Sequence, residues 1–242
     1  MNWLVNNLDL VLELTLQHVK LSIPPIIIGF IISIPLGYIA YRFRLTRGLL
    51  LTLAGLLYTI PSLALFVILP SITGVSALSE LNITIALTIY AVAIMARSVA
   101  DALDSVDPAI RQSATAVGYG SWRRFWTVEF PLAGPVVLAG LRVAAVSTVS
   151  LVTVGILIGV SSLGYLFTNG FQRRIVLEIL TGVVMTLIVA LLLDRILAVG
   201  GKLLMPWASS TNPGGRKSIP VVPPTGNPTG GLASTSDLGS PA

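Results

Sequence analysis

Five long apolar stretches constrain this chain more than any other feature of its sequence. Each is free of Asp, Glu, Lys and Arg, and they cover residues 21–41, 48–79, 81–96, 143–172 and 179–193. A helix of about 20 mostly apolar residues is long enough to cross the hydrocarbon core of a membrane. Only 10% of the residues are charged, against about 25% in a soluble domain. We therefore expect an all-α integral membrane protein that crosses the cell membrane several times.

These stretches predict five transmembrane helices, at about 21–41, 49–72, 81–100, 134–160 and 177–199. Pro61 and Pro70 could instead split the second stretch into a hairpin and give six. Basic residues favour five, because 11 of the 15 Lys and Arg residues then lie on one side of the membrane. Such residues collect in cytoplasmic loops. The prediction therefore places the N-terminus outside the cell and the C-terminus in the cytoplasm.

The two ends of the chain differ from its apolar middle. Residues 1–20 place leucines and valines on one helical face and charged groups on the other. This pattern predicts an amphipathic helix in the outer interface, with a helix packed against the bundle as the alternative. His18, in this segment, is expected to be exposed to water. In the region 207–242, the 35 residues after Trp207 include 22 Pro, Gly, Ser or Thr. That composition cannot bury a core, so we expect a disordered cytoplasmic tail.

The composition excludes several kinds of site. The chain has no Cys and a single His, which rules out thiolate metal sites, His clusters and Ser-His-Asp triads. It also lacks the Gly-x-x-x-x-Gly-Lys-Ser/Thr loop that holds nucleotide phosphates. The net charge of +5 is explained by basic cytoplasmic loops rather than by nucleic-acid binding. We therefore expect a chain that is not an enzyme and that holds no metal, cofactor or nucleic acid of its own.

The segment between the third and fourth predicted spans, 101–131, has the composition of helices rather than of a loop. Asp107 followed by Pro108 is typical of a helix start, because the Asp side chain caps free N–H groups and Pro fits the first turn. Gly118 is suited to the left-handed conformation that ends a helix. The segment therefore predicts a helix, a glycine turn and a second helix.

The second of these helices carries an aromatic face. Ser121 is placed to cap it, and Pro131 to end it where the fourth span begins. Three aromatic rings and a carboxylate share the face, with two arginines to its side: Trp122, Phe125, Trp126, Glu129, Arg123 and Arg124. Such a face is typical of an interfacial anchor with snorkelling arginines. It is equally typical of a docking surface for a cytosolic protein, and composition leaves both open.

This segment resembles the cytoplasmic loop signature of binding-protein-dependent ABC importer permeases. The signature reads Glu-Ala-Ala, three free residues, Gly, nine free residues, Ile, one free residue, and Leu-Pro. Aligned on Gly118, the chain keeps the spacing and matches at Ala114 and Pro131. The departures are Gln112 for Glu, Ser113 for Ala, Val128 for Ile and Phe130 for Leu. Gln112 removes a charge that could pair with a partner.

Further stretches are similar to the subgroup of these permeases that carries osmoprotectants: glycine betaine, carnitine, choline or proline betaine. They are Tyr58–Leu65 in the second span and the run Asp107–Arg142. Many relatives have Gly-Gly-Leu-Gly after the fourth span, where this chain has Ser161-Ser162-Leu163-Gly164. The resemblance covers about residues 20–200 and leaves out the tail.

The resemblance implies a permease subunit that forms the translocation path, driven by a separate cytosolic ATPase that binds ATP and Mg²⁺. It also implies an extracytoplasmic solute-binding protein, a second permease chain (the same or a sister) and contact with membrane lipid. The residues expected to couple to the ATPase are Gln112, Ala114, Gly118, Gly120, Trp122, Arg123, Arg124, Phe125, Glu129 and Pro131. The path is expected to be bordered by Tyr58, Pro61, Ser62 and Tyr90. The aromatic faces of the two tyrosines could attract a quaternary ammonium, and a plain packing role for these residues is the alternative.

Other kinds of protein stay open. One is an ABC permease for another small solute, such as an amino acid or a sulfonate; others are a secondary transporter that works alone and a membrane scaffold. The short chain, with no inverted repeat and few intramembrane acidic residues, disfavours a secondary transporter. Arg142 is the one basic residue well inside a span. We expect it to snorkel, to pair with Asp101 or Asp104, or to take part in gating.

Overall fold

The computed structural model describes residues 2–207, which form helices and no strand. The predicted tail lies outside the described residues, apart from Trp207. In chain order the elements are α1 (Asn2–Asn6), α2 (Leu8–Arg42), α3 (Arg44–Thr59), α4 (Ser62–Thr73), α5 (Glu80–Asp104), α6 (Pro108–Ala116), α7 (Ser121–Arg124), the π-helix η1 (Phe125–Glu129), α8 (Phe130–Val152), the 3₁₀-helix η2 (Thr153–Ile158), α9 (Gly164–Arg173) and α10 (Val176–Leu204).

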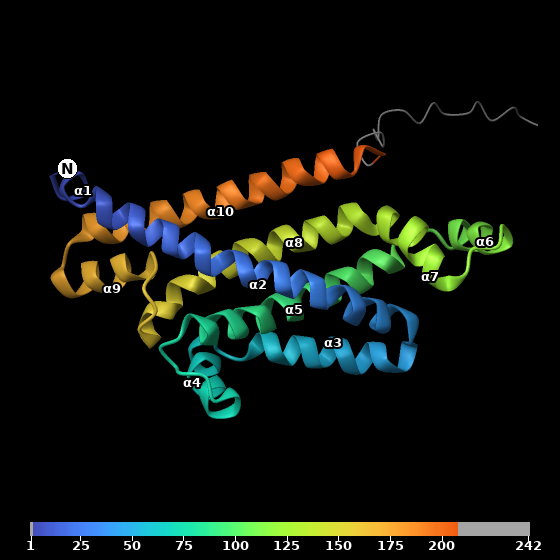
Figure 1. Cartoon of the computed structure of the whole chain (residues 1–242), viewed down its shortest axis with the longest axis horizontal. Coiled ribbons are helices and arrows are strands. Elements are labelled where there is room, and N and C mark those ends of the chain that lie inside the picture. The colour runs from blue at the N-terminus through green and yellow to red at the C-terminus, as the bar shows by residue number, and fades with distance from the viewer. Residues whose placement is uncertain (1, 208–242) are drawn as a thin grey trace, which may run out of the picture. The chain divides into compact units, whose positions relative to one another are not determined.

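Four helices are long and apolar enough to cross a membrane: α2, α5, the helix that runs without a break from Ser121 to Ile158, and α10. Together, α3 and α4 are long and apolar enough for a fifth. Within this bundle α6 and α7 lie at one end, and α9 lies at the opposite end (Figure 1). The prediction of an all-α membrane protein is confirmed.

The segment expected as one span at 49–72 is bent. Helices α3 and α4 meet at an angle of 106°. Ile60 between them is extended, with φ −63° and ψ 129°. The cause is Pro61, which cannot donate a backbone hydrogen bond and disfavours the helical conformation of the residue before it. The break turns α4 away from α3, and the carbonyl of Ile60 at the bend accepts a hydrogen bond from the hydroxyl of Tyr90.

The first long helix, α2, starts well before the predicted first span. It is continuous from Leu8 to Arg42, with no break near residue 20. Val11 and Leu14 are buried among side chains of α9 and α10. His18 is fully buried, and its Nε2 lies 3.0 Å from the carbonyl oxygen of Val149. The expectation that His18 is exposed to water is therefore wrong: its helix face is covered by the bundle.

The core of the bundle is the contact between α2 and α5. Gly29 and Gly37 of α2 lie directly against α5, and a Cβ atom at either position would come within 2.5 Å of the Cβ of Ala91 or Val99. Small residues at such positions let two helix backbones approach closely and pack without a gap. Most of the inward face of α5 is buried, so this helix is the fixed element against which α2, α3 and α8 are placed.

Candidate functional site

The first half of the predicted helix–turn–helix forms as expected. The carboxylate of Asp107 accepts a hydrogen bond from the backbone N–H of Ala109 at 2.8 Å, and Pro108 occupies the first turn of α6. Gly118 adopts a left-handed conformation with φ +89°. The N–H of Tyr119 then donates to the carbonyl of Ala114 at 3.0 Å and closes the helix end. These are local signals, and the structure confirms the helix and the turn that they predicted.

The second half differs from the expectation. The N-cap of α7 is Gly120, not Ser121. The helix does not end at Pro131, because a π-helical turn, η1, continues into α8 and Pro131 lies in the first turn of α8. A proline ring inside a helix presses on the carbonyl four residues earlier. The widened turn immediately precedes the proline and relieves this contact. The second helix of this segment and the fourth span are therefore one continuous helix.

The side chain of Arg124 links the two helices of this segment. Nε of Arg124 donates to Oε1 of Glu129 at 2.6 Å, and the side chain of Glu129 is only 2% exposed. The Nη1 of Arg124 also donates to Oγ1 of Thr115 on α6 at 2.7 Å. The buried ring of Phe125 packs on Tyr38 of α2, with ring centroids 4.6 Å apart. These contacts fix α6, α7 and η1 to each other and to the bundle.

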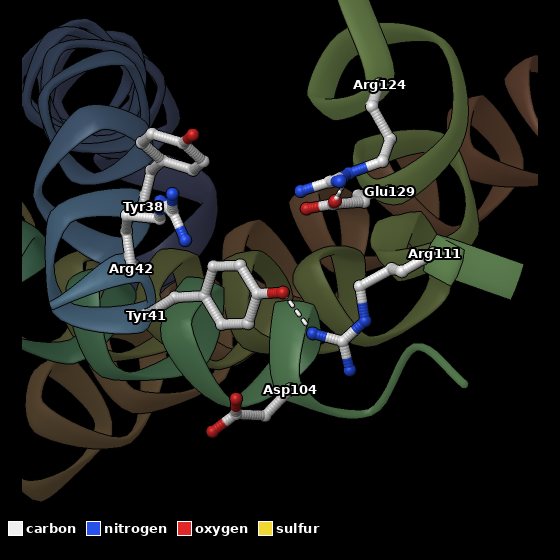
Figure 2. A pocket seen from close by; sticks show the side chains of 7 residues that line it. All are labelled: Tyr38, Tyr41, Arg42, Asp104, Arg111, Arg124 and Glu129. Carbon is white, nitrogen blue, oxygen red and sulfur yellow. Dashed lines mark hydrogen bonds and ion pairs between the residues drawn. The ribbon is translucent and has the colours of Figure 1, made fainter. Parts of the chain in front are cut away.

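A polar cavity of about 430 Å³ lies beside this segment, lined by Tyr38, Tyr41, Arg42, Asp104, Arg111, Arg124 and Glu129. In Figure 2 the residues of α2 lie on one side of it and Arg124, Glu129 and Arg111 on the other. The guanidinium of Arg111 donates to the hydroxyl of Tyr41 and, at 2.7 Å, to the carbonyl of Val106. The link from Tyr41 to Arg111 joins residues 70 positions apart, which no local pattern could reveal.

The predicted coupling residues fall into two groups. Phe125 and Glu129 are buried, and Ala114, Arg124 and Pro131 are half-buried. The others are exposed: Gln112, Gly118, Gly120, Trp122 and Arg123. Trp122, at 69% exposed, is a large apolar side chain on an open surface. The first group holds the segment in shape, and the second presents a surface that a partner can contact.

The four residues expected along the path lie together. Tyr58, Pro61, Ser62 and Tyr90 line one cavity of about 530 Å³, with Val146, Ser147, Ser150 and Leu151 of α8 on its other wall. The rings of Tyr58 and Tyr90 are 6.1 Å apart and nearly perpendicular. The Tyr90 hydroxyl donates to the carbonyl of Ile60 at 2.5 Å. The cavity thus combines two aromatic rings with hydroxyl groups and has no charged residue in its lining.

Arg142 has a different partner from those predicted. Its Nε and Nη2 donate to the two carboxylate oxygens of Asp194 on α10, at 2.6 and 2.7 Å. Asp101 and Asp104 instead form ion pairs with Arg47. The expected pairing of Arg142 with Asp101 or Asp104 is therefore wrong, because Arg142 faces α10 and not the end of α5.

No group of three or more His, Asp or Glu side chains among residues 2–207 is placed to hold a metal ion. The features of the site that can act chemically are thus the aromatic cavity, the Arg142–Asp194 pair and the exposed surface of the helix–turn–helix. Together these can bind a small solute and a protein partner.

Comparison with known proteins gives a consistent result. The family model described as "Binding-protein-dependent transport system inner membrane component" matches residues 29–208. The osmoprotectant import permease protein OsmW of Salmonella typhimurium is 30% identical over 198 residues, which are 81% of this chain and 92% of OsmW. The choline transport system permease protein OpuBB of Bacillus subtilis is 28% identical, over 79% of this chain and 87% of OpuBB.

Solved structures share the fold. A chain of the MetNI methionine ABC transporter, in an inward-facing conformation, has a TM-score of 0.70 at 18% identity and covers 84% of this chain and 97% of its own length. A chain of an amino acid ABC transporter has a TM-score of 0.65 at 13% identity, over 84% of this chain and 96% of that one. At these identities the likeness shows the fold.

Proposed function

Because the chain belongs to the family of binding-protein-dependent transport system inner membrane components, we propose that it is the permease subunit of an ATP-driven importer for osmoprotectants of the glycine betaine, choline and carnitine type. The observation that carries this proposal is the match over most of the chain to permeases whose names give osmoprotectants and choline as their solutes. The protein is a multi-pass membrane component. We place its N-terminus outside the cell and its C-terminus in the cytoplasm, on the side where most of its basic residues lie.

Three partners follow from this function. A separate cytosolic subunit binds ATP and Mg²⁺ and hydrolyses the nucleotide. An extracytoplasmic binding protein delivers the solute, and a second permease chain, identical or a sister, completes the path. Support for a second chain comes from α8, where Val136, Val143 and Val146 are exposed on one side of the helix. Val146 also lines the aromatic cavity.

The exposed part of the helix–turn–helix is the surface on which the ATPase docks. Trp122 supplies an apolar contact, Arg123 a charge, and Gly118 the turn that brings α6 and α7 together. Because α7 continues through η1 into α8, a movement of the docked segment is passed directly to the wall of the aromatic cavity. Gln112 lies on the same exposed surface, so the missing charge of the signature weakens the docking without changing the shape of the segment.

The aromatic cavity is where the solute passes. A quaternary ammonium group cannot donate a hydrogen bond, and aromatic faces attract it through the ring quadrupole. Tyr58 is half exposed and presents such a ring at the broken span, with the buried ring of Tyr90 beside it. Ser62 and Ser147 add hydroxyl groups to the same cavity. A cavity without charged side chains binds such a solute weakly, which suits a path that must release what the binding protein delivers.

Uptake by the reconstituted importer tests the proposal. Proteoliposomes would hold this chain, its ATPase and its binding protein, with labelled glycine betaine outside and ATP on the side of the ATPase. We expect uptake that requires ATP and is lost in Gly118→Pro. It should persist in Gly55→Ala on α3, a control outside the docking segment where an added Cβ meets no other atom. Uptake without ATP would point to a secondary carrier. ATPase activity that depends on Gly118, with no uptake of any onium solute, would overturn the solute assignment.

A further inference from the structure

The Arg142–Asp194 pair is unusual in its place. Arg142 is the only charged residue of α8, and Asp194 lies ten residues before the end of α10. The two groups form two parallel hydrogen bonds of 2.6 and 2.7 Å. This fork-to-carboxylate geometry is the strongest kind of ion pair that proteins make. Charged groups within apolar membrane-spanning helices are rare and are candidates for a functional site.

The pair is also accessible. The side chain of Arg142 is 41% exposed and that of Asp194 is 19% exposed. Both line a cavity of about 380 Å³ together with Ala139, Val143, Val146 and Ser147. A pair that served only to join α8 to α10 would be expected to lie sealed between the two helices. This one opens into a space large enough for a small solute.

The cavity of the pair adjoins the aromatic cavity. Val146 and Ser147 line both, and Arg142, Val146 and Ser150 are spaced four residues apart along α8. Residues at this spacing lie one above the other on one helix face. A solute that moves along this face therefore meets the tyrosines at one level and the Arg142 guanidinium at the next.

We propose that Arg142 forms a second solute-binding site on the translocation path. Its guanidinium binds the carboxylate of a zwitterionic solute in place of the carboxylate of Asp194. This inference rests on the proposed function and refines its solute class. Asp194 then acts as an internal competitor: it keeps the guanidinium paired when no solute is present and releases it when a solute carboxylate arrives. No bond is made or broken covalently, and the net charge of the site stays at zero because the solute is itself neutral overall.

Replacement of the Asp194 carboxylate by a solute carboxylate distinguishes two kinds of onium solute. Glycine betaine and carnitine carry a carboxylate and can take the place of Asp194. Choline carries a hydroxyl group instead, and a neutral hydroxyl cannot displace a carboxylate from a guanidinium. The tyrosines therefore bind the ammonium group of both kinds of solute, whereas Arg142 binds only the carboxylate of the zwitterions.

Direct binding tests this inference. The intact permease–ATPase complex in nanodiscs would be titrated with labelled glycine betaine and, separately, with labelled choline. Arg142→Gln is expected to weaken binding of glycine betaine about tenfold, the loss of one charge-assisted interaction, and to leave choline within about twofold. Asp194→Asn removes the competitor and is expected to strengthen binding of glycine betaine severalfold. Lys202→Gln, an exposed charge eight residues further along α10, is the control and should change neither.

Opposite effects of the two single variants on one solute are the signature of competition. If both variants weaken both solutes by the same factor, or if the wild-type complex binds the two solutes equally or not at all, the inference is overturned. Each single variant leaves one charge without its partner and could therefore misfold. The double variant Arg142→Gln with Asp194→Asn leaves no unpaired charge and is the control for this effect. It should keep choline binding and lose the preference for glycine betaine. ATP-dependent uptake by the wild-type importer tests the proposed function independently, so either idea can fail alone.

Discussion

Arg124 and Glu129 form an ion pair across the π-helical turn that precedes α8, with Nε donating to Oε1 at 2.6 Å. The carboxylate is buried, and the guanidinium also reaches Thr115 on α6. The pair therefore holds the turn at the point where the proposed docking segment continues into the long apolar helix α8.

Glu129→Gln should destabilise this turn. Removing one charge of a buried pair typically costs about 3–5 kcal/mol, and the partial exposure of Arg124 reduces the expected loss to about 2 kcal/mol. Thermal unfolding in nanodiscs, followed by tryptophan fluorescence, measures the change. Arg123→Gln is the control, because Arg123 is exposed and lies over the Tyr119 ring rather than on a carboxylate. A Glu129→Gln variant as stable as Arg123→Gln would show that the pair contributes nothing.

Gly118→Ala and Gly120→Ala should differ in how strongly they reduce stimulation of the ATPase, although the two glycines are only two residues apart. Gly118 has φ +89°, and Gly120 has φ −66°. No atom would obstruct a Cβ at either position, so the difference is purely one of backbone conformation. A left-handed residue with a Cβ costs about 1–2 kcal/mol. Stimulation of the ATPase by the reconstituted permease is expected to fall more in Gly118→Ala than in Gly120→Ala, where the backbone conformation suits any residue. Equal activity of the two variants would contradict a rigid turn.

Gly29→Ala should loosen the contact between α2 and α5. The new methyl group would lie 2.5 Å from the Cβ of Ala91, closer than carbon atoms can pack, so the helices must separate. Overpacking of this kind costs about 1–3 kcal/mol. Gly55→Ala on α3 meets no neighbouring atom and should be neutral or slightly stabilising, because alanine favours a helix. The melting temperatures of the two variants give the comparison, and a stable Gly29→Ala would mean that the helices are not in close contact.

Tyr90→Phe and Tyr90→Ala should separate two roles of one side chain. The phenylalanine keeps the ring but loses the hydrogen bond to the Ile60 carbonyl, so stability should drop by about 1 kcal/mol with KM for uptake nearly unchanged. The alanine also removes the aromatic face and should raise KM about threefold to tenfold. Tyr58→Ala should raise KM similarly. Uptake kinetics over a range of solute-loaded binding protein measure this, and unchanged KM in both alanine variants would place the path elsewhere.

The structural features that the sequence predicted most reliably are those set by residues close together in the chain. Asp107 with Pro108 and the turn at Gly118 are set by a few adjacent residues, and apolar stretches longer than a membrane is thick admit little besides spanning helices. The residues around the broken span were also found together, because Pro61 and the tyrosines belong to one recognisable stretch and its partner helix.

The remaining differences involve contacts between distant segments. Asp194 is 52 residues from Arg142, and no periodicity links them, so nearer carboxylates were the natural guess. His18 is covered by a helix 131 residues away. Pro131 lies inside a continuous helix whose preceding turn is widened, and that adjustment has no signal in residue types alone.

The unbroken helix from Ser121 to Val152 carries the proposed docking surface near one end and the wall of the aromatic cavity near the other. At about 1.5 Å per residue it is about 48 Å long, and a tilt of about 10° about its midpoint would carry each end about 4 Å in opposite directions. A push on Trp122 would thus displace Ser150 by roughly the same amount the other way. In the proposed importer, movement of the ATPase would then reach the solute cavity as a rigid rotation of this helix. The side chains between its two ends would not need to change their packing.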